Sequence, residues 1–100
     1  MITGTFKVLG CGDLIQVPSQ KAEGGFIRKR FIRLQEFGGY SHQDSADHAS
    51  NAVICTLIGN SAQCVFYPYD LVMVAYRTSL REYQGNWYQD NTIVEIDKLK

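Results

Sequence analysis

The segment Leu71–Leu99, with the sequence LVMVAYRTSLREYQGNWYQDNTIVEIDKL, decides the fold of this chain. It contains two runs rich in Val, Ile, Thr and aromatic residues, with Gln-Gly-Asn at 84–86 between them. Turn residues between two such runs are a strong local signal for a β-hairpin. The segment therefore predicts two long antiparallel strands joined by a tight turn.

Alternation of side chains along a strand assigns the two faces of this hairpin. A two-residue loop would mix the apolar and polar sets, so a three-residue loop at 84–86 is preferred. It predicts four cross-strand pairs: Tyr83 with Trp87, Arg81 with Gln89, Tyr76 with Val94, and Val74 with Ile96. The inner face then places Tyr76 and Tyr88 in the core. The outer face carries Arg77, Arg81, Tyr83 and Trp87.

Length and composition predict a single cytoplasmic domain over residues 1–100. A chain of 100 residues buries roughly 60 to 70 per cent of the surface that it exposes when unfolded, which is enough for one core. The sequence contains no run of about 18 apolar residues, the length that a membrane-spanning helix needs, so no such helix is expected. The start MITGTFKVLG lacks the basic and long apolar regions of a signal peptide. Cys11, Cys55 and Cys64 have no spacing typical of zinc sites, so reduced thiols are expected.

Charge is distributed unevenly along the chain. Ten basic and ten acidic side chains give a formal net charge of zero, which argues against strong attraction of the whole molecule to nucleic acid. Residues 28–33 nevertheless include four basic side chains and no acid, whereas residues 40–70 include three acids and no base. One face of a neutral protein is therefore expected to be basic.

Three further strands are expected before the hairpin. Residues Ile2–Val17 predict a long first strand that bends at its glycines, Phe26–Phe37 a second, and the apolar run Ala52–Gly59 a buried third. One or two helical turns, capped by Asn60 or Ser61, are expected before Pro68. This order predicts an all-β fold with one short helix, a five-stranded Greek-key OB-fold barrel. An SH3-like or other small barrel is the alternative.

Three stretches of the chain carry a family resemblance: TGTFKVLG at 3–10, GGFIRKRFIRLQ at 24–35, and YDLVMVAYRTSLREYQGNWYQDNTIVEI at 69–96. The last includes an Arg-aromatic pair, Arg81 and Tyr83, and an aromatic pair after the turn, Trp87 and Tyr88. These stretches resemble bacterial single-stranded DNA-binding proteins and, more closely, a family of small bacterial OB-fold proteins related to them. The resemblance covers nearly the whole chain and implies single-strand binding in DNA replication or repair.

Single strands bind to basic grooves in which aromatic rings stack on the bases. The candidate nucleic-acid-binding residues are Arg28, Lys29, Arg30, Phe31, Arg33, Arg77, Arg81, Tyr83 and Trp87. A structural interpretation stands beside this one. Basic residues on an outward strand face also occur as solvated surface, an aromatic pair at a turn also occurs as hairpin packing, and Phe31 also suits a core position.

Other chemistry finds little support in the residues. His42, Asp44, Asp47 and His48 are metal-capable types in a polar loop at 38–51, but a Gly- and Ser-rich loop would not hold ligands rigidly, so no metal site is predicted. The chain lacks P-loop, GxGxxG and GxSxG motifs, and neither catalysis nor a cofactor is predicted.

The leading hypothesis is largely sequence-independent binding of single-stranded DNA, or RNA, by a homo-oligomer, a dimer or tetramer. The rival is a protein-interaction or oligomerisation module on the same barrel, with no nucleic-acid role. The neutral net charge and the apolar segment Val65–Tyr69 favour the rival.

Overall fold

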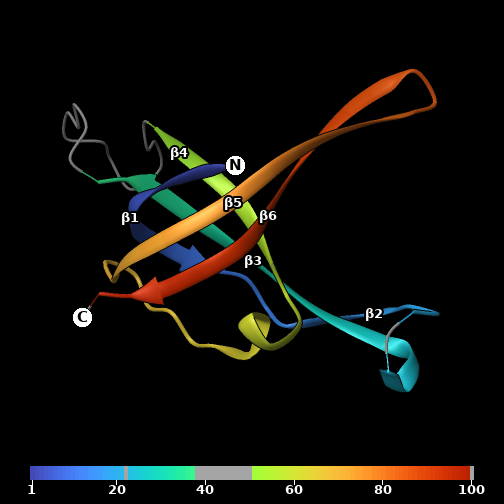
Figure 1. Ribbon diagram of the computed structural model, residues 1–100, viewed down its shortest axis with the longest axis horizontal. Helices are drawn as coiled ribbons and strands as arrows, with labels where there is room; N and C mark the ends of the chain where they lie inside the picture. The colour runs from blue at the N-terminus through green and yellow to red at the C-terminus, as the bar shows by residue number, and fades with distance from the viewer. Residues whose placement is uncertain (22, 38–50, 100) are drawn as a thin grey trace.

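One sheet of six strands makes up most of the molecule, and its first strand closes it into a ring (Figure 1). The structure is a computed structural model that describes residues 1–21, 23–37 and 51–99. Its elements are β1 (Ile2–Cys11), β2 (Ile15–Pro18), η1 (Glu23–Gly25), β3 (Phe26–Glu36), β4 (Ala52–Ile58), η2 (Gly59–Gln63), β5 (Leu71–Tyr83) and β6 (Asn86–Lys98). The mostly β architecture confirms the predicted class.

The ring closes because β1 is long enough to pair with two strands. Its first half, from Ile2 to Lys7, pairs with β5, and its second half, from Phe6 to Cys11, pairs with β3. The strands follow one another in the order β1, β5, β6, β4, β3, with β2 added beside β3. All pairings are antiparallel except that of β4 with β6, which meet at Thr56 and Thr92.

A bend in β1 lets one strand serve both partners. The register with β3 shifts between Val8 and Gly10, and the guanidinium of Arg33 lies directly over Gly10, where any Cβ would collide with it. The predicted glycine bend is therefore present, although the strand does not run unbroken from Ile2 to Val17. The chain leaves the sheet after Cys11 and returns as β2 at Ile15.

The core fills the inside of the ring with alternate side chains from its five strands. The residues packed there include Phe6, Val8, Ile32, Leu34, Cys55, Leu57, Val72, Val74, Tyr76 and Ile93. Ala62 of η2 and Phe66 after it are also buried in this cluster, so the connection between β4 and β5 covers one end of the ring. Tyr76 is 8 % exposed, which confirms its predicted core position.

That connection is shorter and less helical than the sequence indicated. It forms a single 3-10 segment, η2, and no side chain caps it, so the predicted cap at Asn60 or Ser61 is wrong. The Ser61 hydroxyl instead donates to the carbonyl of Ile58 at 3.0 Å. No helix in the described part of the chain is long and apolar enough to cross a membrane.

The hairpin of β5 and β6 has a two-residue turn, so the predicted three-residue loop is wrong. Tyr83 pairs with Asn86, and Gln84 and Gly85 both have positive φ, 53° and 80°, as the mirror-image turn of tight hairpins requires. Arg81 consequently faces Tyr88, not Gln89.

A bulge at Val94 restores the predicted register farther along the hairpin. Tyr76 pairs with Ile93, not Val94, whereas Val74 pairs with Ile96 as predicted. The extra residue in β6 shifts the register by one between Tyr76 and Ala75, which is what a bulge does.

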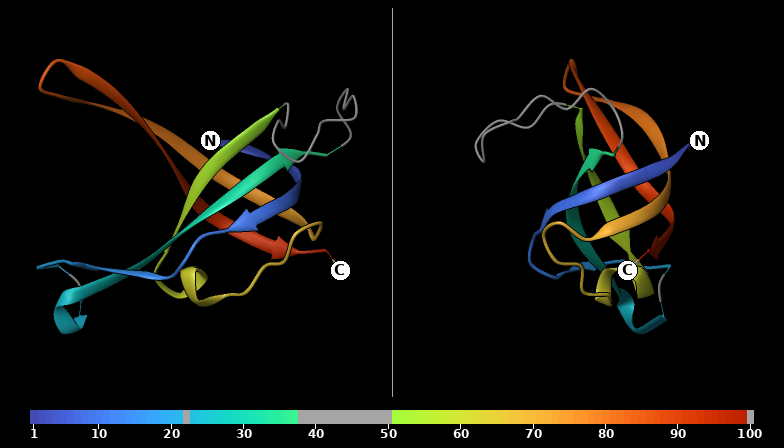
Figure 2. Two further views of the ribbon diagram at one scale, coloured as in Figure 1. Left: turned by 180° about the vertical axis from the view of Figure 1, so that it is seen from behind. Right: turned by 90° about the vertical axis from the view of Figure 1, so that its left-hand side faces the viewer.

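Two β-ribbons extend beyond the ring as arms. One is the distal part of β5 and β6, from Arg77 to Thr92, and the other is β2 with the start of β3 (Figure 2). Both consist of two paired strands that leave the same side of the molecule in Figure 1. The change from ring to arm explains why burial varies along β3: Ile32 and Leu34 lie in the ring and are buried, while Arg28 lies in the arm and is exposed.

The three cysteines differ sharply in exposure, which gives a direct test of the fold. Cys55 is buried and Cys64 is exposed, and desolvation raises the pKa of the Cys55 thiol to about 11. Because the thiolate is the nucleophile, we expect iodoacetamide at neutral pH to label Cys64 in the native protein and to spare Cys55 until denaturant is added. Peptide mass spectrometry measures this, and equal labelling of both would contradict the packing of β4.

Candidate nucleic-acid interface

One row of side chains crosses four strands on the outer face of the ring. Phe31 on β3 pairs with Thr56 on β4, Thr56 pairs with Thr92 on β6, and Thr92 pairs with Arg77 on β5. Paired residues project to the same face of a sheet, and neighbouring strands lie about 4.8 Å apart, so roughly 14 Å separates the ends of this row. The row joins an aromatic ring and a guanidinium across a surface of two small hydroxyl side chains.

The same register extends this outer face in both directions. On β3, Lys29 pairs with Ile58 and Arg33 pairs with Ile54, so Lys29, Phe31 and Arg33 share the face. On the β5–β6 arm, Arg81 and Tyr83 project to the side that Arg77 occupies, because all three have the same parity. We call the surface made by Lys29, Phe31, Arg33, Thr56, Ile58, Arg77, Arg81, Tyr83, Tyr88 and Thr92 the outer basic face.

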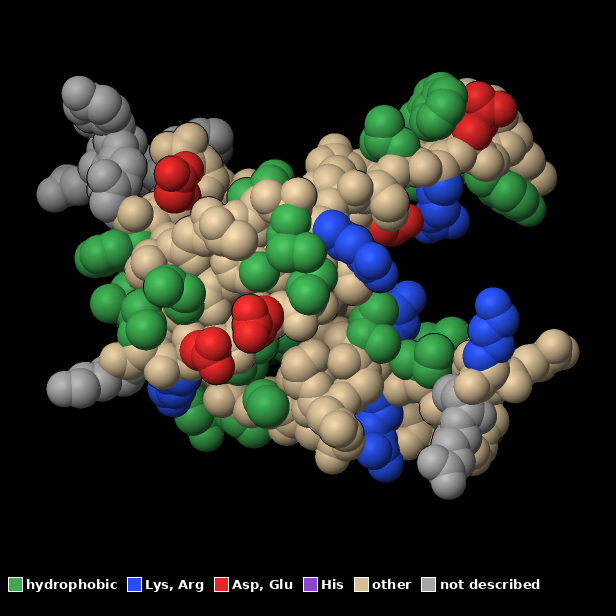
Figure 3. All heavy atoms as spheres, in the orientation of Figure 1, with side chains coloured by type: hydrophobic (Ala, Val, Ile, Leu, Met, Phe, Trp, Pro, Cys, Tyr) green, Lys and Arg blue, Asp and Glu red, His purple; other side chains and the backbone are tan. Residues whose placement is uncertain are grey.

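A hollow separates the two arms. Figure 3 shows it as a deep notch at one side of the molecule, with Lys and Arg side chains along both of its walls. A net charge of zero for the whole chain therefore coexists with a notch whose walls are rich in Lys and Arg, although an acidic side chain is also visible on the upper wall (Figure 3). Concave surfaces lined mainly by one sign of charge concentrate counter-ions of the opposite sign.

Arg81 has two partners on this face. Its Nε lies 2.9 Å from Asp90 Oδ2, and its guanidinium lies 5.1 Å from the centre of the Tyr88 ring. Both members of the ion pair are largely solvent-exposed, so the pair itself contributes little to stability. Asp90 does, however, neutralise part of the positive charge that this arm would offer to phosphate.

Replacing Asp90 therefore tests whether the ligand is negatively charged. In Asp90→Asn, Arg81 keeps a hydrogen-bonding neighbour but loses the competing carboxylate. We expect single-stranded DNA to bind about threefold to tenfold more tightly at low salt, with the gain shrinking as salt screens the charge. Fluorescence anisotropy at two salt concentrations measures this effect, and weaker binding would show that Asp90 contacts the ligand favourably.

Not all predicted basic residues belong to the outer basic face. Arg28 and Arg30 have the parity of the buried Ile32 and Leu34, so they project from the other side of β3. The Nε of Arg30 is buried and has no hydrogen-bond partner in the described part of the chain. Burial raises the pKa of the nearby Cys11 thiol, although the charge of Arg30 and Arg33 acts against this increase.

The two aromatic residues at the hairpin turn lie on opposite faces of the arm. Tyr83 shares the face of Arg81, whereas Trp87 pairs with Glu82 on the reverse face. Trp87 is 66 % exposed there. The two-residue turn separates them, because the predicted three-residue loop would have placed them opposite each other.

Sequence reasoning missed four residues of this face: Thr56, Ile58, Tyr88 and Thr92. Tyr88 was expected in the core, but it is 41 % exposed and lies opposite Arg81. Phe31 is also exposed, at 42 %, so it does not occupy the core position considered for it. The sequence did contain an indication for Tyr88. Adjacent residues on a strand project to opposite faces, so only one of Trp87 and Tyr88 can share a face with Arg81.

The metal-capable residues His42, Asp44, Asp47 and His48 lie outside the described residues. Within 1–21, 23–37 and 51–99, no group of three or more His, Cys, Asp or Glu side chains is placed to hold a metal ion.

Comparison with models of protein families, with curated proteins and with solved structures found no match. The arrangement of the chain's own residues is therefore the basis for the functional proposal that follows.

Proposed function

We propose that the ring is an OB-fold. Three features support this: the first strand pairs with both β5 and β3, the third and last strands of the ring pair in parallel, and the short η2 lies between β4 and β5. In OB-folds, the face of the second and third strands and the flanking loops bind oligonucleotides. The equivalent strands here are β3 and β4, and the two arms are the equivalents of those loops.

We propose further that the protein binds single-stranded DNA, or RNA, largely independently of sequence and in the cytoplasm. The observation that carries this proposal is the row from Phe31 to Arg77, flanked by Lys29 and Arg81, because it combines ring faces for stacking with cations for phosphate. Ile58 and Tyr88 add exposed apolar surface beside these cations. Aromatic side chains set among cations are the combination that single-strand-binding surfaces use.

Titration of a fluorescently labelled oligothymidylate tests the proposal. We expect binding at low salt, with a log–log salt slope of roughly −0.7 for each phosphate contacted. Lys29, Arg77 and Arg81 would together give a slope near −2. A duplex of the same length is the control, since stacking on Phe31 requires unpaired bases. An oligothymidylate that does not bind at low salt would overturn the proposal.

A second candidate is self-association as a dimer or tetramer. The observation that favours it is a set of exposed apolar side chains that do not belong to the outer basic face: Val65, Tyr67, Tyr69 and Met73. Lys7 and Lys98 lie over two of these rings, Tyr69 and Tyr67. Light scattering with size exclusion tests this candidate, and a monomer at all concentrations would exclude it.

A further inference from the structure

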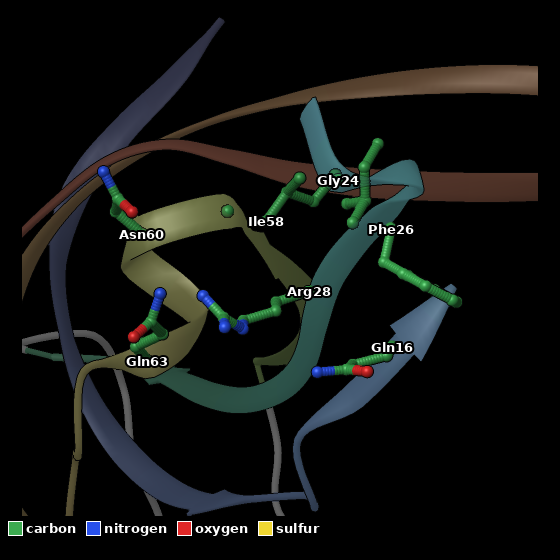
Figure 4. Close-up of a pocket in the computed structure, with 9 residues that line it drawn as sticks. Gln16, Gly24, Phe26, Arg28, Ile58, Asn60 and Gln63 are labelled. Carbon is green, nitrogen blue, oxygen red and sulfur yellow. The ribbon is translucent and has the colours of Figure 1, made fainter. Parts of the chain in front are cut away.

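A pocket lies between η2 and the β2–β3 arm. Its volume is about 380 Å³, which is within the usual range for sites that bind small organic groups. It is lined by Gln16, Gly24, Phe26, Ile27, Arg28, Ile58, Gly59, Asn60 and Gln63. Figure 4 shows Arg28 extending from β3 toward η2, with its guanidinium beside Gln63.

The polar groups of this pocket are free to bind a ligand. The side chains of Gln16, Arg28 and Gln63 make no hydrogen bond or ion pair with any other described residue. Arg28 supplies donors in a planar fork, and each glutamine supplies one amide donor group and one carbonyl acceptor. Phe26 and Ile27 add apolar lining.

The pocket adjoins the surface on which a strand would lie. Ile58 lines the pocket and also pairs with Lys29 on the outer basic face, at the end of β4. Arg28 projects to the opposite side of β3 from Lys29, so a single strand that follows Lys29 would reach this pocket only by turning past Ile58 at the end of β4. Gly59, next in the chain, leaves open space where a side chain would project.

We propose that this pocket takes a guanine base of the bound strand. A guanidinium fork matches the O6 and N7 acceptors of guanine, and an amide carbonyl matches its N1 and N2 donors. Adenine would present an amino group to Arg28 in place of O6, so the two donors would oppose each other. This inference rests on the proposed single-strand binding and adds to it one position with a base preference.

The test compares oligothymidylate with the same oligomer carrying one central guanine. We expect the guanine to tighten binding about tenfold, which is within the discrimination that one bidentate base contact provides. An adenine or a cytosine at that position should give no gain, and 7-deazaguanine, which lacks the N7 acceptor, should lose most of it. Equal affinity for all these oligomers would overturn the inference while leaving the proposed function intact. A lack of binding to every oligomer would overturn both.

Two variants assign any preference to the pocket. Arg28→Lys keeps the positive charge but lacks the fork, so the guanine gain should disappear while the affinity for oligothymidylate stays within about twofold. Gln63→Ala should reduce the gain without changing the affinity for oligothymidylate. Lys29→Ala is the matched control on the outer basic face, and it should weaken both oligomers equally. A guanine preference that survives both pocket variants would place its origin elsewhere and overturn the inference.

The source of the base is tested with free guanosine monophosphate. We expect guanosine monophosphate to compete weakly, because it lacks the neighbouring nucleotides, whose phosphates and bases the outer basic face would bind. Binding of guanosine monophosphate as tight as that of the guanine-containing oligomer would identify a free-nucleotide site and overturn the assignment to a strand.

Discussion

The double variant Lys29→Ala with Arg77→Ala should lower the affinity for single-stranded DNA about 100-fold at low salt. The two cations lie on different strands, β3 and β5, and the ring brings them to the same face. Hydrogen bonds to charged groups contribute about 1.5 to 3 kcal/mol each, and two losses near the lower limit amount to about 100-fold. The salt slope should become shallower by about 1.4, or 0.7 for each lost phosphate contact. Anisotropy titrations across a salt series measure both quantities.

A control with the same change in net charge separates a local site from general electrostatics. Lys7 and Lys98 lie outside the outer basic face, where their amino groups are 5.6 Å and 5.7 Å from the rings of Tyr69 and Tyr67. At a salt concentration of about 0.15 M, Lys7→Ala with Lys98→Ala should change the affinity by less than about threefold, because neither lysine belongs to the outer basic face and the Debye length is then only about 8 Å. If this control lost as much affinity as the first variant, total charge and not the outer basic face would govern binding.

The outer basic face could be predicted only in part, because its strands are brought together by pairings between residues that are distant in sequence. The alternation within β3 placed Phe31 and Arg33 together, and the structure keeps them together. The alignment of Phe31 with Arg77 depends on one parallel contact, Thr56 with Thr92, between strands that the chain does not connect directly. No local pattern specifies such a contact.

The error in the hairpin has a specific physical origin. A three-residue loop with no bulge and a two-residue loop followed by a one-residue bulge give the same pairing of Val74 with Ile96. The apolar residues near the ring therefore fit both arrangements. Only the arm between Tyr76 and the turn distinguishes them, and its exposed residues on both faces provide no hydrophobic pattern to fix the register. The choice decides whether Trp87 or Tyr88 lies beside Arg81.

That choice leads to the second large effect, in the variant Phe31→Ala with Tyr88→Ala. Each stacked base contributes about 1 to 3 kcal/mol by alanine substitution, so losing both rings should weaken single-strand binding about 100-fold. Because these substitutions remove no charge, the salt slope should stay unchanged, unlike that of the double cation variant. Tyr88→Phe keeps the ring face next to Arg81 and should bind within about twofold of the unmodified protein.

Trp87→Ala is the decisive comparison, because it removes the largest exposed ring of the arm from the reverse face. If the ligand lies on the outer basic face, this variant should lose less than about threefold in affinity, and Trp87 fluorescence should change little when oligothymidylate binds. A loss larger than that of Phe31→Ala, with strong quenching of Trp87, would mean that the strand crosses the arm on the face of Leu80 and Trp87. Arg77 and Arg81 would then lie on the face of the arm that the ligand does not touch. The affinity of the variant Lys29→Ala with Arg77→Ala should in that case also stay near that of the unmodified protein. The two double variants therefore succeed or fail together, and Trp87 shows which face of the arm binds the ligand.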